Sequence, residues 1–145
     1  MTLVIDTNIV LDLWVFEDPA QAPLADALAA GRMEWVATAA MRDELVRVLG
    51  YPLIARRLHA QARHGAEVLA AFDARTRRID TLPARAPCVC SDPDDQGFID
   101  LAVAHRATLL SKDRAVLAMR KRLAAHGVTV AQGLTVVENG AGTLA

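Results

Sequence analysis

Near its first residue the chain reads Leu3-Val4-Ile5-Asp6-Thr7-Asn8, and the fold class can be inferred outward from these six residues. The apolar run at 3–5 is typical of a short buried strand. Apolar residues recur at helical spacing after Asn8, so a helix is expected directly after the strand. Asp6 therefore lies at the carboxyl end of a strand, which is where open parallel sheets bind their ligands.

The rest of the chain repeats this alternation of strands and helices. Short apolar runs predict further strands at 33–37, 109–111 and 128–130. Helices are expected at 19–30, 39–49, 95–105 and 114–126, with one or two more within 53–76, and the proline-containing stretch 80–94 is expected to be irregular. Such alternation predicts an α/β protein: a three-layer α/β/α sandwich with a mostly parallel sheet, formed by residues 1–145 as a single domain.

The composition excludes several classes of protein. Sixteen Lys and Arg face seventeen Asp and Glu, a net charge of −1, so neither a strongly basic nor a disordered acidic chain is indicated. No apolar run is long enough to span a membrane, and we expect a soluble, cytoplasmic protein with no membrane partner. Cys88 and Cys90 form neither a disulfide framework nor a zinc motif, and the histidines lack metal-binding spacing.

Four carboxylates fall where this layout would bring them together. Asp6 and Asp113 each follow a strand, Glu44 lies in a predicted helix, and Asp95 lies at the start of another. Each has a structural alternative, because Asp6 and Asp113 could cap the helices that follow them and Glu44 could be a solvated surface residue. Asp92, followed by proline, is typical of a helix N-cap, which leaves Asp95 open to either role.

Carboxylates crowded at one sheet edge repel one another unless a cation neutralises them. A site with oxygen ligands alone, without His or Cys, selects hard ions such as Mg²⁺ or Mn²⁺ before Zn²⁺. Such an ion lowers the pKa of a bound water and polarises a phosphoryl oxygen. The acidic residues therefore favour phosphodiester chemistry.

Four pieces of sequence stand in a specific order along the chain: Val4-Ile5-Asp6-Thr7-Asn8, Arg42-Asp43-Glu44-Leu45, Asp92-Pro93-Asp94-Asp95-Gln96-Gly97-Phe98-Ile99-Asp100-Leu101-Ala102 and Leu109-Leu110-Ser111-Lys112-Asp113. In these pieces the chain resembles the PIN domains, in particular the small bacterial toxins of the VapC type. The resemblance covers essentially the whole chain. Each piece alone is common, whereas four in this order are considerably more specific.

The resemblance implies a Mg²⁺- or Mn²⁺-dependent ribonuclease that prefers single strands and is the toxin of a toxin–antitoxin pair. It further implies an RNA substrate, a cognate antitoxin protein as a partner, and a homodimer. The residues implied to bind metal and catalyse the reaction are Asp6, Glu44, Asp95 and Asp113, which we call the acidic quartet; Asn8, Ser111 and Asp92 are implied to support them.

Two positions in these pieces, Asp95 and Lys112, allow more than one interpretation. Asp95, rather than its neighbours, is assigned to the quartet because Phe98, Ile99 and Ala102 follow it three, four and seven residues on, which places it near the buried edge of the helix. Lys112 departs from the family pattern, and either contacts phosphate or is solvated.

The segment 42–85 carries nine arginines against five acids, a local balance of +4. A solvated helical face explains such arginines, and a basic rim for a phosphate backbone does so as well. Trp14, Phe16, Trp35 and Phe72 are expected in the core, so stacking on bases is not predicted.

Two other functions fit the same residues. A Mg²⁺-dependent phosphatase would use Asp6 as its nucleophile, although Asn8 then stands where a general acid is expected. A non-catalytic PIN-like scaffold would bind RNA or protein without hydrolysis, and its expected signature is the loss of one or more quartet acids, all of which are present here.

Overall fold

The computed structural model describes residues 1–136 and 142–144. Its central sheet has five strands in the order β3-β2-β1-β4-β5, and every neighbouring pair is parallel. β1, which carries Leu3-Val4-Ile5, lies at the centre of this order, between β2 and β4. The strands are β1 (Thr2–Ile5), β2 (Glu34–Ala37), β3 (Thr76–Arg78), β4 (Thr108–Leu110) and β5 (Thr129–Ala131).

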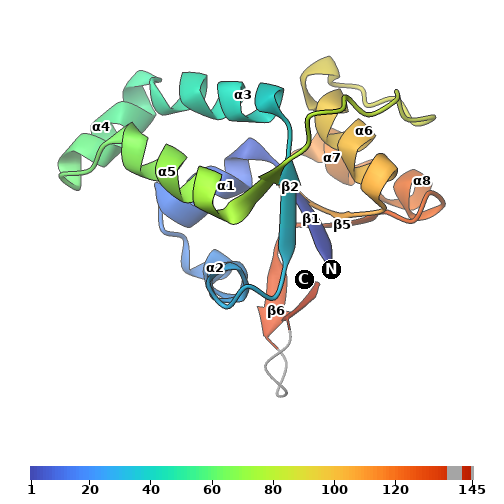
Figure 1. Ribbon diagram of the computed structural model, residues 1–145, viewed down its shortest axis with the longest axis horizontal. Helices are drawn as coiled ribbons and strands as arrows, with labels where there is room; N and C mark the ends of the chain where they lie inside the picture. The colour runs from blue at the N-terminus through green and yellow to red at the C-terminus, as the bar shows by residue number, and fades with distance from the viewer. Residues whose placement is uncertain (137–141, 145) are drawn as a thin grey trace.

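Helices cover both faces of the sheet, which confirms the three-layer α/β fold (Figure 1). The strand order runs outward from β1 to β3 and then returns across the sheet to β4 and β5, so right-handed crossovers place the earlier helices on one face and the later ones on the other. One group holds α1 (Thr7–Trp14), α2 (Ala22–Ala29), α3 (Ala39–Leu49), α4 (Pro52–Ala60) and α5 (Gly65–Arg75), and the other holds α6 (Gln96–His105), α7 (Arg114–Leu117) and α8 (Arg120–Ala124).

Short 3-10 turns precede two of these helices: Pro19–Gln21 before α2 and Pro93–Asp95 before α6. In both, an aspartate at the N-cap accepts a backbone hydrogen bond and proline follows it, a combination that starts helices well. Over residues 1–136 and 142–144, no helix combines the length and the apolar character needed to cross a membrane.

The core lies on both sides of the strands. Leu3, Val4 and Ile5 are buried, as predicted for the first strand. Trp35 of β2 packs edge-on against Phe72 of α5, with ring centroids 5.2 Å apart. The expectation that Phe16 belongs to the core was wrong: its side chain is exposed, and the Arg57 guanidinium lies 5.8 Å above its ring.

The helix at 39–49 has the predicted bounds, because the Thr38 hydroxyl caps it by accepting a hydrogen bond from the Met41 N–H. The stretch 53–76 forms two helices, with α5 beginning at Gly65. The prediction of a continuous helix at 114–126 was wrong, because the chain divides into α7 and α8 with the fully buried Met119 between them.

Two features were absent from the sequence-based prediction. β3 adds a three-residue edge strand directly after α5, where a helical stretch was expected to end. β6 (Leu134–Val136) and β7 (Gly142–Leu144) form a separate antiparallel pair. Both are too short for the alternation of apolar and polar residues to be recognisable.

Candidate metal centre

The carboxyl ends of β1 and β4 carry Asp6 and Ser111 to the same edge of the sheet. The Asp6 N–H donates to the Leu110 carbonyl at 2.9 Å, and the Ser111 N–H donates to the Ala131 carbonyl at 3.0 Å, so both residues extend the sheet's hydrogen bonding. The Ser111 hydroxyl, which is fully buried, donates to Oδ2 of Asp6 at 2.6 Å. This bond fixes the orientation of the Asp6 carboxylate. Although Asp6 stands at the N-cap position of α1, its side chain makes no capping hydrogen bond.

Asp113 and Asp92 each cap a helical turn and still present an oxygen to the site. Oδ1 of Asp113 accepts from the Ala115 N–H at 2.8 Å, and Oδ1 of Asp92 accepts from the Asp94 N–H at 3.0 Å. The capping role anticipated for both residues is therefore present. Each cap uses Oδ1, so Oδ2 of each carboxylate is left outside the capping interaction.

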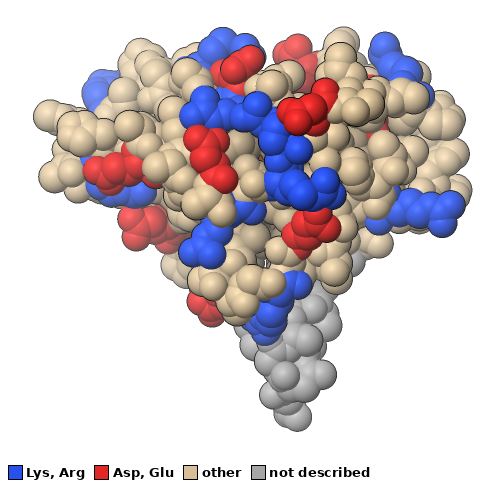
Figure 2. All heavy atoms as spheres, in the orientation of Figure 1, with Lys and Arg blue, Asp and Glu red and all other residues tan. Residues whose placement is uncertain are grey.

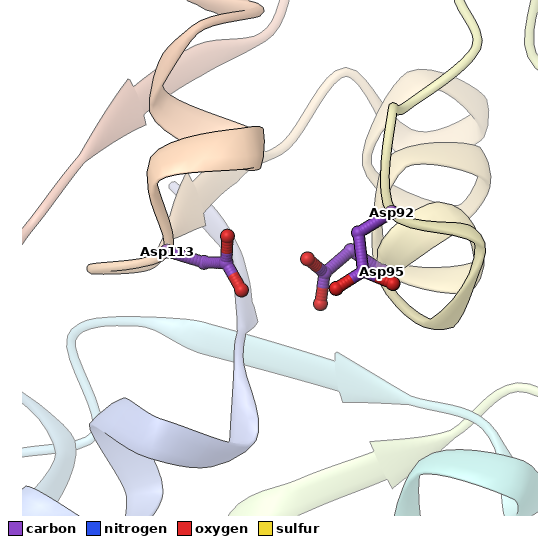
Figure 3. A group of neighbouring side chains, drawn as sticks. All are labelled: Asp92, Asp95 and Asp113. Atoms are coloured by element: carbon purple, nitrogen blue, oxygen red, sulfur yellow. The ribbon is translucent and has the colours of Figure 1, made fainter.

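Asp92, Asp95 and Asp113 converge from two sides of the site (Figure 3). Each offers one carboxylate oxygen, and these oxygens all lie within 4.8 Å of one another. Asp95 is buried, and its Oδ2 has no hydrogen-bond partner among the residues that the structure describes. We call these three residues the aspartate cluster.

The site raises the pKa of three of its carboxyl groups. Burial, the charge of Asp6 and a hydrogen bond with Asp113 raise the pKa of Asp95 from 3.8 to about 7. Burial also raises the pKa of Asp6, with the Ser111 hydrogen bond opposing this effect. The pKa of Glu44 is raised by burial and by the charge of Asp6. The fold thus holds several carboxylates in a place that disfavours their negative charge.

The whole acidic quartet lines one pocket of about 290 Å³, together with Asn8, Asp92 and Asp94. No lysine or arginine lines it among residues 1–136. Oδ1 of Asn8 is buried and lacks a hydrogen-bond partner among the described residues. The structure thus brings Asp6, Glu44, Asp95 and Asp113 to one pocket, although Asp6 and Glu44 stand outside the aspartate cluster.

These residues fit a hard divalent cation. The ligands on offer are all oxygens, which Mg²⁺ and Mn²⁺ prefer, and the buried Oδ2 of Asp95 and Oδ1 of Asn8 have no hydrogen-bond partner among the described residues. A bound cation would also offset the burial and the mutual repulsion that raise the three pKa values. Asp92, Asp95 and Asp113 are the residues placed to hold it.

Sequence reasoning missed two contributions to this site. The Thr7 hydroxyl forms a hydrogen bond with Glu44 that lowers the pKa of that carboxyl group against the effect of burial. Asp12, buried on α1, lies 2.5 Å from Nζ of Lys112, so Lys112 pairs with a buried acid next to the site. The sequence singled out neither residue. Thr7 directly follows Asp6, which is the stronger candidate ligand, and Asp12 is a single acid among the apolar residues of its helix.

Three of the nine arginines of segment 42–85, namely Arg42, Arg63 and Arg77, form ion pairs with acids among the residues that the structure describes. On the face shown in Figure 2, cationic and acidic side chains adjoin one another rather than forming an unbroken basic surface. Arg42 binds Asp73 through two hydrogen bonds of 2.8 and 2.9 Å, and Arg77 pairs with Glu34. These two arginines are therefore partly neutralised.

Comparison with known proteins agrees with the sequence resemblance. The PIN domain family matches residues 2–115. The crystal structure of VapBC2 from Rickettsia felis bound to a DNA fragment from their promoter contains a chain with this fold: the TM-score is 0.58 at 16% sequence identity, covering 90% of this chain and 97% of that one. No curated protein matches the sequence. Because the family match extends over most of its length, the chain belongs to the PIN domain family.

Proposed function

We propose that this PIN domain is a Mg²⁺- or Mn²⁺-dependent endoribonuclease that hydrolyses RNA phosphodiester bonds. The observation that carries the proposal is the aspartate cluster, in which three carboxylates converge at a pocket lined by further acids. Helix capping alone does not explain this arrangement, because bringing three carboxylates together costs electrostatic repulsion that a bound cation would relieve.

In the proposed reaction, Asp92, Asp95 and Asp113 hold the cation at the carboxyl edge of the sheet. A bound Mg²⁺ supplies a water of lowered pKa and neutralises charge on the phosphate. Asp6, fixed by the Ser111 hydroxyl, and Glu44, bonded to Thr7, line the pocket beside the cluster, where they would help to hold the cation and orient the attacking water. Asn8 would offer an uncharged oxygen at the same place.

We further propose that the protein is the toxin of a toxin–antitoxin pair and acts in the cytoplasm as a homodimer of single-domain chains. Two findings support this: the resemblance in sequence to toxins of the VapC type, and the shared fold with a chain of the VapBC2 complex. A cognate antitoxin would have to cover or neutralise an acidic pocket, so a basic segment is the expected complement.

The test is cleavage of structured and unstructured RNA by the purified protein in Mg²⁺, in Mn²⁺ and in EDTA. Asp6→Asn and Asp95→Asn are the site variants, and Asp43→Asn, which changes an exposed acid adjacent to Glu44 on α3, is the matched control. We expect metal-dependent cuts with the wild type and Asp43→Asn, and background levels with the two site variants. Full activity in a folded Asp95→Asn protein would end the catalytic proposal.

The same preparation discriminates the two alternatives. A phosphatase acting through Asp6 would form an acid-stable, base-labile phosphoryl group on that residue, whereas metal-assisted hydrolysis by water forms none. A scaffold would bind RNA without cutting it in any metal. The intact quartet and the crowding of carboxylates favour the nuclease over the scaffold.

A further inference from the structure

A second, smaller pocket of about 90 Å³ adjoins the acidic pocket. Glu44 and Asp94 line both, so the two hollows are contiguous. Beyond these shared acids, the smaller pocket lies between the first turns of α3 and α6 and is lined by Thr38, Ala40, Met41, Gly97 and Phe98. A substrate whose phosphate sits at the aspartate cluster would place an adjoining group there.

Gly97 keeps this pocket open, and the fold does not require a glycine at that position. It is the second residue of α6, where glycine lowers helix stability relative to alanine. Its φ is not positive, unlike that of Gly31 and Gly127. A Cβ added at Gly97 would meet no atom within 4 Å, so close packing does not demand glycine either. The absence of a side chain at Gly97 therefore leaves space in this pocket.

The lining suits a flat, partly apolar group that donates hydrogen bonds. Phe98 and Met41 are buried and contribute apolar surface to its lining. The lining also includes the carboxylates of Glu44 and Asp94, which only accept hydrogen bonds when ionised. Asp94 is exposed, and its carboxylate takes part in no ion pair among the residues that the structure describes.

We propose that this pocket binds the nucleobase next to the scissile phosphate and favours a base with an exocyclic amino group, which Asp94 accepts. Cytosine, adenine and guanine carry such a group, whereas uracil presents carbonyl oxygens in its place. Uracil would place a carbonyl oxygen against the Asp94 carboxylate, so that two hydrogen-bond acceptors would face each other. The inference rests on the proposed ribonuclease activity and adds a base preference to it.

The first test is to map the ends of fragments cut from a random-sequence RNA pool by the wild type and by three variants. Gly97→Val fills the pocket, Asp94→Asn replaces an acceptor by a group that also donates, and Gly65→Ala is the control at the start of another helix, where an added Cβ makes ordinary contacts. For the wild type we expect uracil to be disfavoured about tenfold at one position beside the cut, as the loss of one hydrogen bond implies.

The variants should change the pattern rather than abolish cutting. Gly97→Val is expected to erase the preference at that position, Asp94→Asn to shift it toward uracil, and Gly65→Ala to retain it. A Gly97→Val protein that cuts with the wild-type pattern would overturn the pocket assignment. If the wild type cuts no RNA in any metal, the failure lies with the proposed ribonuclease instead, which keeps the two outcomes distinct.

A second measurement does not depend on cleavage. In ¹H–¹⁵N spectra recorded with Mg²⁺, titration with cytidine monophosphate should shift the Gly97 amide signal, and uridine monophosphate should shift it less. Gly127, which precedes the amino end of the edge strand β5, provides the internal reference. Equal shifts at Gly97 with both nucleotides would contradict the amino-group preference.

Discussion

The Ser111 hydroxyl donates to Oδ2 of Asp6 at 2.6 Å, and this bond joins the ends of two neighbouring strands whose residues lie 105 positions apart in the chain. Oγ of Ser111 also accepts from the Asp113 N–H at 3.1 Å. One fully buried hydroxyl thus orients one acid of the quartet and the backbone of another. Its position makes Ser111 a positioning residue for the proposed cation site.

Replacing Ser111 by alanine should therefore weaken both stability and activity. Oδ2 of Asp6 and the Asp113 N–H would lose their partner, which costs about 1–3 kcal/mol of unfolding free energy. Loss of such a supporting bond should reduce metal affinity or cleavage about 10–100-fold. Urea unfolding and metal titration would measure the two effects.

Ser111→Thr retains the hydroxyl and should retain most of the activity, and Ser91→Ala, at an exposed serine before the cluster, is the control. Because the Ser111 bond lowers the pKa of Asp6, its removal should also move the acidic limb of the pH–activity profile to higher pH. If Ser111→Ala lowers stability but leaves the pH–activity profile unchanged, Ser111 contributes only to packing and does not position Asp6.

The stability of the metal-free protein should fall as the pH rises from about 4 to 7. The pKa of Asp95 is about 7 in the folded protein and near 3.8 in the unfolded chain, so the folded state binds more protons throughout this window. Unfolding free energy then decreases with pH, and the raised pKa values of Asp6 and Glu44 act in the same direction. Urea unfolding in EDTA at several pH values would measure this slope.

Asp95→Asn should flatten that slope and raise metal-free stability near pH 8 by about 1–2 kcal/mol, less than an unscreened shift would imply because solvent screens the site. Asp43→Asn should leave the slope unchanged. Mg²⁺ should stabilise the wild type more at pH 8 than at pH 5.5, since it competes with protons for the same oxygens. A flat pH profile for the wild type would contradict the clustering of charged acids.

The pair formed by Lys112 and Asp12 should be structural. Lys112→Met would leave the buried Asp12 carboxylate without its cation and should cost about 2 kcal/mol, less than the cost for a fully buried pair, because the Lys112 side chain is 41% exposed. Adding Asp12→Asn should restore most of this stability. Thermal or urea unfolding of the two single variants and the double variant would give the coupling energy. Additive effects would show that the two charges do not interact.

Gln96 should hold the segment before the aspartate cluster in place. Its side chain accepts from the Cys90 N–H at 2.7 Å and donates to the Cys88 carbonyl at 3.0 Å. Gln96→Ala would leave both buried backbone groups unpaired and should cost about 2–3 kcal/mol. Limited proteolysis should then cut within residues 80–92.

Gln61→Ala removes two longer, partly buried hydrogen bonds, one donated to the Val15 carbonyl and one accepted from Arg63, and serves as the control for Gln96→Ala. It should have a smaller effect on stability and none on proteolysis of segment 80–92. Equal effects from the two glutamine variants would argue against a specific role for Gln96.

Much of the fold could be predicted because its signals are local. The run Leu3-Val4-Ile5 and the capping residue Thr38 each act within a few positions, and both gave elements close to those observed. The break between α7 and α8 could not be predicted, because it accompanies the burial of Met119 among distant residues. β3 likewise depends on pairing with β2, which no local pattern reveals.

Local patterns were enough to predict the α/β class and the places of the acidic residues at strand ends and helix starts, because these follow from periodicity and capping chemistry over short stretches. Which oxygens converge depends instead on the tertiary structure. It grouped Asp92 with Asp95 and Asp113, bound Asp6 to Ser111, and turned Lys112 toward Asp12. Those contacts depend on how strands far apart in the chain align, which sequence spacing does not specify.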